Sequence, residues 1–168
     1  VTANKLNETD NTIIKSTDIT MTGELVIPEG ITSIQNINNT SLDYVKIPAS
    51  VVSLGSSAFT YNLGLRMIVF SENSKLTTIG YSAFSNCTSL TSVTLGDSVT
   101  IIGSDAFSNC TSPESITIPN SVTTIESGTF SSCYSLTDII IPNSVTTIGD
   151  YAFNGCHAFT NIIIPNSV

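Results

Sequence analysis

The sequence predicts a solenoid, in which similar short units of chain stack in one direction and share one apolar core. The segment Ala-Phe-Ser-Asn-Cys at 83–87 has close copies downstream, which place Phe107, Phe130 and Phe153 at successive intervals of 23 residues from Phe84. A unit of this length cannot bury an apolar side alone, whereas stacked copies share a continuous core. Five of the six prolines also fall in one column of the repeat: Pro28, Pro48, Pro119, Pro142 and Pro165.

Each unit consists of a strand-like run, a turn and a shorter run. In the first run, apolar residues occupy positions one, four and six, as in Leu90, Val93 and Leu95. The turn carries the proline column, and because proline lacks the N–H donor that a central strand needs, this column marks the end of the strand. The shorter run has apolar residues three apart, as in Val99 and Ile102.

The N-terminal units are less regular than the later ones. Phe59 precedes Phe84 by 25 residues, and we place the two extra residues in the stretch 71–75. We expect residues 1–24 to form an N-terminal cap or lead-in, and residues 25–168 to form about six turns that stop in mid-repeat. A finished array closes with a polar capping unit, so an uncovered last strand favours end-to-end self-association.

The charge balance excludes several classes of partner. The 168 residues include 13 acidic and 5 basic side chains, for a formal net charge of −8. Binding to nucleic acid or to an anionic membrane surface depends on Lys and Arg, so neither is expected. No apolar run approaches the roughly 20 residues of a membrane span. All five basic residues precede Leu76, so the two ends of the solenoid should differ electrostatically.

Three matching segments give the repeat a family resemblance: Leu-Thr-Ser-Val-Thr-Leu at 90–95, Ser-Val-Thr-Ile-Ile-Gly at 98–103 and Ala-Phe-Ser-Asn-Cys at 106–110. This pattern resembles the BspA-like subfamily of leucine-rich repeats, over about residues 25–168. The resemblance implies a right-handed α/β solenoid that is mostly β, with a parallel sheet on the concave face and short turns or helical pieces outside. It also implies a secreted or cell-surface protein of bacteria or protozoan parasites, with a role in adhesion.

The residues that could carry chemistry are better explained by the repeat. Cys87, Cys110, Cys133 and Cys156 share the 23-residue period, so we interpret them as buried free thiols in one core column. His157, the single histidine, directly follows a cysteine, and adjacent side chains in an extended turn point apart, so no Cys–His nucleophile pair is expected. The sequence therefore predicts no enzyme, no metal site and no cofactor.

The residues between the core positions of the longer run should point outward, because side chains alternate along a strand. Core columns repeat one residue type, whereas these outward columns vary, and such variation is where recognition can be encoded. Exposed apolar and aromatic residues also suit protein partners. The predicted partner-binding face consists of Tyr44, Lys46, Met67, Val69, Ser92, Thr94, Ser115, Thr117, Asp138, Ile140, Asn161 and Ile163.

These observations favour a non-enzymatic binding module that contacts a host, matrix or microbial surface protein through the concave sheet face. Two alternatives remain open from the residues. One is a structural spacer or stalk with no ligand of its own. The other is a carbohydrate-binding module, for which Tyr44 and Tyr61 are the candidate exposed aromatic residues that lie near each other in sequence.

Overall fold

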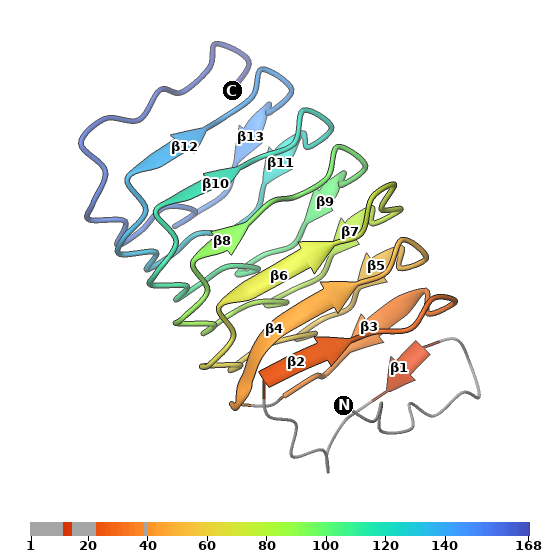
Figure 1. Ribbon diagram of the computed structural model, residues 1–168. Helices are drawn as coiled ribbons and strands as arrows, with labels where there is room; N and C mark the ends of the chain where they lie inside the picture. Colours follow the sequence, from red (N-terminus) through yellow and green to blue (C-terminus); the bar gives the residue numbers. More distant parts are fainter. Residues whose placement is uncertain (1–11, 15–22, 39) are drawn as a thin grey trace.

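The computed structural model describes residues 12–14, 23–38 and 40–168. The chain winds into a stack of turns, and the turns before the last add strands to one or both of two ladders (Figure 1). Within these residues the strands are β1 (Thr12–Ile14), β2 (Gly23–Val26), β3 (Ser33–Gln35), β4 (Leu42–Ile47), β5 (Ser53–Leu54), β6 (Met67–Phe70), β7 (Thr78–Ile79), β8 (Ser92–Val93), β9 (Ile101–Ile102), β10 (Ser115–Thr117), β11 (Thr124–Ile125), β12 (Asp138–Ile140) and β13 (Thr147–Ile148).

The even-numbered strands form what we call the first ladder, and the odd-numbered strands form the second. The first ladder runs β2-β4-β6-β8 and continues with the pair β10-β12, which lies beside β8. The second runs β1-β3-β5-β7-β9 and continues with β11-β13. All pairings are parallel. The sequence predicted the first ladder as a parallel sheet; the second arises because the shorter run of each unit also pairs with its copy in the next turn.

The core consists of the repeat's apolar columns, as the 23-residue period predicts. Leu90, Val93 and Leu95, at positions one, four and six of their unit, are all buried. The phenylalanine column is a continuous stack: neighbouring ring centroids lie 5.2–5.7 Å apart and the ring planes are within 12° of parallel. Four of its rings are fully buried, and Phe153, in the last turn, is half-buried.

Of the short turns or helical pieces expected on the outside, the described residues contain turns and no helix, so the α/β description is confirmed only in its β part. In the turn around Phe84, Ser82 and Asn86 both have the left-handed backbone conformation, with φ of 52° and 62°. Two left-handed residues four apart interrupt any right-handed helix. The N–H of Phe84 also donates to the carbonyl of Ala106 in the next turn, at 2.8 Å, instead of to a carbonyl four residues earlier.

The two ends of the chain depart from the regular pattern. The predicted lead-in at 1–24 lies largely outside the described residues, but Thr12–Ile14 form β1, which pairs with β3, and Gly23 begins β2. At the other end, the strand-like run that begins at Phe159 is not a strand. Its apolar residue Ile164 is exposed, because no later turn in the described chain covers it.

A glycine column brings the backbones of successive turns close together. A Cβ built on Gly103 would lie 2.8 Å from the nitrogen of Tyr81 and 2.9 Å from the carbonyl carbon of Gly80. Real Cβ atoms do not approach backbone this closely, so the column requires glycine for space. Gly96, in the proline column, is different: a Cβ there would meet nothing within 4 Å.

Replacing Phe107 tests the phenylalanine stack. Phe107→Ala should lower the free energy of unfolding by about 3–5 kcal/mol, because it opens a cavity between the rings of Phe84 and Phe130. Urea denaturation of the variant and the wild type measures the difference. Stability close to that of the wild type would show that Phe107 does not support the core.

The two glycine environments provide a matched pair of substitutions. Gly103→Ala should destabilise the protein by roughly 1–3 kcal/mol, since the neighbouring backbone must move. Gly96→Ala should leave stability unchanged or raise it by about 0.5 kcal/mol, because it reduces the freedom of the unfolded chain without a clash. Thermal unfolding of both variants measures the contrast, and equal effects would contradict it.

Candidate binding face

The first ladder brings the predicted binding residues into two outward columns. In the first column Tyr44 pairs with Met67, and Met67 pairs with Ser92. In the second column Lys46 pairs with Val69. In the next turns, Ser115 pairs with Asp138 and Thr117 pairs with Ile140. Side chains far apart in the sequence therefore lie side by side on one surface, which we call the ladder face.

Exposure follows the alternation that the sequence predicts along each strand. Of the twelve predicted residues, Tyr44 and Val69 are half-buried and the other ten are exposed. The apolar members are strongly exposed, with 45% of the surface of Met67 accessible, 66% of Ile140 and 75% of Ile163. Asn161 and Ile163 are exposed like the other outward residues, but they belong to the run that forms no strand.

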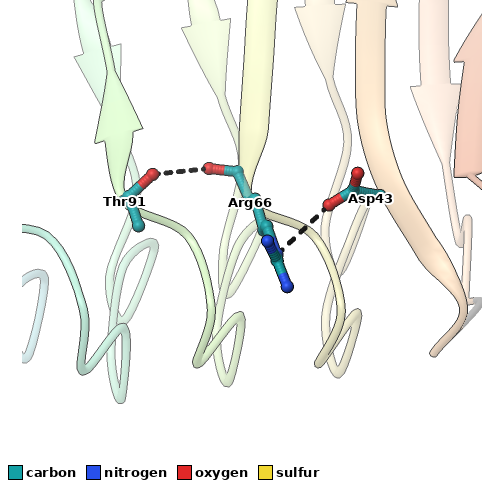
Figure 2. Close-up of polar contacts among 3 residues, drawn as sticks. All are labelled: Asp43, Arg66 and Thr91. Atoms are coloured by element: carbon teal, nitrogen blue, oxygen red, sulfur yellow. Dashed lines mark hydrogen bonds and ion pairs between the residues drawn. The ribbon is translucent and has the colours of Figure 1, made fainter.

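The starting edge of the ladder face carries one ion pair. The Nε of Arg66 lies 3.4 Å from a carboxylate oxygen of Asp43, and the hydroxyl of Thr91 donates to the carbonyl oxygen of Arg66 at 3.1 Å (Figure 2). Both charged side chains are largely exposed, so the pair contributes little to stability. The ion pair does offset the charge of the basic side chain next to Met67.

The sequence-based selection of residues missed a pocket at the edge of the ladder face. The pocket has a volume of about 470 Å³, and its lining includes Met67 and Thr94, which were predicted, together with Phe70, Gly96 and Asp97, which were not. Two irregularities of the repeat mark the position of this pocket in the sequence. The unit before Gly96 contains the two extra residues, and the proline column is broken at Ser71 and Gly96.

The cysteines line the core as predicted, and all four are free. Each thiol donates to the carbonyl oxygen of a phenylalanine in the preceding turn; for example, Cys110 Sγ lies 3.2 Å from the oxygen of Phe84. Burial raises the pKa of the Cys87 thiol to about 12, partly offset by a backbone hydrogen bond. Burial likewise raises the pKa of Cys110. At neutral pH these thiols are protonated and therefore poor nucleophiles.

The single histidine and the potential metal-ligating residues do not gather at the ladder face in the described part of the chain. His157 stacks on Tyr134, with ring centroids 5.8 Å apart, and is exposed. The histidine, cysteine and acidic residues at 12–14, 23–38 and 40–168 form no group of three that could hold a metal ion. Over the same residues, the structure has no helix with the length and apolar character of a membrane span.

Comparison with protein families gives a match over most of the chain. The profile of the BspA type leucine-rich repeat region matches residues 17–66 and 61–168, in six copies.

The chain belongs to the BspA-type leucine-rich repeat family.

Solved structures agree with this assignment. A leucine-rich repeat protein from Bacteroides ovatus is 33% identical, with a TM-score of 0.72, over 81% of this chain and 35% of its own. A leucine-rich cell surface protein from Faecalibacterium prausnitzii is 30% identical, with a TM-score of 0.74, over 90% of this chain and 50% of its own. The T. pallidum leucine-rich repeat protein is 26% identical, with a TM-score of 0.62, over 82% of this chain and 78% of its own.

The BspA-type chain thus spans about half or less of the length of the first two of these proteins. A search of curated proteins finds no match. What the family membership establishes is the repeat solenoid, a fold that is typically non-catalytic and commonly mediates protein interaction.

Thiol titration tests the assignment of the cysteine column. In guanidinium chloride, DTNB should detect four free thiols. In the native protein Cys156, which is half-buried, should react first, and the three buried thiols should react slowly because burial keeps them protonated and inaccessible. Fewer than four thiols after denaturation would indicate a disulfide and contradict the structure.

Proposed function

We propose that this chain is a non-enzymatic binding module, secreted or displayed at a cell surface, that contacts a protein partner through the ladder face. The observation that carries the proposal is the contrast between the two sides of the first ladder. The inward columns repeat apolar residues and are buried, whereas the outward columns change from Tyr44 and Met67 to Ser92 and then to Asp138. Packing imposes no such variation, so these columns are free to encode recognition.

The chemistry of the face supports a protein as the partner. Large apolar side chains are exposed on the ladder face on both sides of Ser92 and Ser115, with Met67 on β6 and Ile140 on β12. Ser and Thr hydroxyls between them can donate and accept hydrogen bonds. Exposed apolar residues with polar surroundings are typical of protein contact surfaces.

The surface location is supported by one relative. The F. prausnitzii protein is described as a cell surface protein, and it shares the fold at 30% identity over 90% of this chain. A host, matrix or microbial surface protein is the kind of partner that such a location would offer. A spacer without a ligand is the alternative that the following experiment must separate.

Replacing three neighbouring residues of the ladder face tests the proposal. The triple variant Tyr44→Ala, Met67→Ala and Val69→Ala should weaken binding to an immobilised partner by about tenfold or more, because truncating the apolar anchors of an interface removes most of its binding energy. Surface plasmon resonance against a panel of purified matrix, serum and microbial surface proteins identifies the partner with the wild type and then measures the loss.

A matched control keeps loss of fold separate from loss of binding. The triple variant Tyr81→Ala, Ile101→Ala and Tyr134→Ala removes three exposed residues of similar size that lie off the ladder face. It should bind as the wild type does, and both triple variants should unfold near the wild-type temperature. Equal affinity of the ladder-face variant and the wild type would overturn the ladder face as the binding site, whereas no partner in the panel would favour the spacer.

A further inference from the structure

The pocket at the edge of the ladder face lies between β6 and the segment that follows β8. Pairing between β4 and β6 continues to Ile47 and Phe70, but pairing between β6 and β8 ends at Ile68 and Val93. Beyond these residues the two segments are not paired as strands, and a pocket of about 470 Å³ is lined by both of them. Its lining includes Met67, Val69, Phe70, Ser71, Gly96 and Asp97.

Two local exceptions to the repeat coincide at this pocket. The turn after Phe70 is two residues longer than the corresponding turns, because the extra residues at 71–75 extend it. The proline column is interrupted at Ser71 and at Gly96, the two positions that border the pocket on its neighbouring turns. A Cβ added to Gly96 would meet nothing within 4 Å, so the missing proline ring leaves open space.

The lining combines an apolar base with a single charge. Met67 is exposed, and Val69 and Phe70 are half-buried, whereas the position of Phe70 is occupied by fully buried residues such as Ile47 and Ile118 in other turns. Asp97 is the one charged residue in the lining. Its carboxylate makes no hydrogen bond or ion pair with any residue that the structure describes.

The nearby basic side chains form no ion pair with Asp97 in the described part of the chain. Arg66 pairs with Asp43, at 3.4 Å, on the edge where the strand begins. Lys75 follows the lengthened turn and Lys46 pairs with Val69 from β4, but neither lines the pocket. From Leu76 to the C-terminus the chain has six acidic residues and no basic residue, so the side of the pocket formed by residues 92–98 belongs to a negatively charged part of the molecule.

We infer that this pocket receives one basic side chain, lysine or arginine, of a partner protein. The aliphatic stem of such a side chain would cover Met67 and Val69, while its cationic head would reach the carboxylate of Asp97. A long basic side chain combines these two chemistries in one group. This inference rests on the proposed function, since the pocket adjoins the ladder face, and it names the chemistry that the partner must present there.

Short peptides test the pocket without the natural partner. The probe is acetyl-Gly-Lys-Gly-amide, and the corresponding arginine peptide is a second basic probe. The corresponding norleucine peptide is the control, because its side chain is aliphatic like the lysine stem and carries no charge. In NMR titrations of the full chain, the basic peptides should shift the methyl signals of Met67 and Val69. The norleucine peptide should bind about threefold or more weakly, and added salt should reduce the difference.

Two substitutions at the pocket, with a third at a distant acid as the control, locate the interaction. Asp97→Asn should abolish the preference for the basic peptides over norleucine, while Asp150→Asn, at an exposed acid of a distant turn, should leave it unchanged. Gly96→Pro should weaken the binding of all three peptides, because it introduces the proline ring that other turns carry at this position. Among the described residues the N–H of Gly96 donates no backbone hydrogen bond, so a proline at this position removes none.

The outcomes separate this inference from the proposed function. Equal binding of lysine and norleucine peptides, preferential binding of a neutral saccharide such as N-acetylglucosamine, or a preference that survives Asp97→Asn would each overturn the inference. The proposed function would then still stand if the ladder-face triple variant loses its partner. If instead that variant keeps full affinity while the peptides bind as expected, the proposed function fails and the pocket remains.

Discussion

Contact between identical side chains in successive turns is the interaction on which this structure depends. The phenylalanine rings stack at 5.2–5.7 Å in nearly parallel planes, and each ring closes the cavity left by the one before. Because every turn presents the same cavity to the next, one residue type is selected again and again at each inward position. The strand ladders follow from this stacking, since it sets equivalent backbone segments side by side.

The other inward columns satisfy the same geometry in different ways. The cysteine column fills space, and its thiols also donate to phenylalanine carbonyl oxygens. The Sγ–O distances are 3.1–3.3 Å for Cys87, Cys110 and Cys133. In the preceding turn, Asn62 occupies the cysteine column and donates an amide hydrogen to the carbonyl of Phe59, so a polar residue is buried without being left unpaired. The glycine column provides the close approach of one backbone to the next. Each column thus answers one requirement of stacking.

Function in such an array is expected at positions where the side chains can vary from turn to turn, or where the repeat is interrupted. On the ladder face the side chains are free to vary, since they point away from the core. At Ser71 and Gly96 the repeat is broken, and the loss of two prolines and the gain of two residues open a pocket with an acidic side chain at its rim. Both features belong to the same surface, so a partner that covers the ladder face would also meet the pocket.

The sequence by itself determined the solenoid, the core columns and the outward direction of the ladder-face residues, because a repeat that recurs every 23 residues reports stacking and alternation directly. It could not show that the shorter runs pair into a second ladder or that left-handed residues at Ser82 and Asn86 replace helical pieces, since both depend on hydrogen bonds between turns. The pocket also required the tertiary structure. The missing prolines and the lengthened turn were visible as irregularities, but only the structure showed that strand pairing ends at Ile68 and Val93 and that a pocket lined by Asp97 lies beyond.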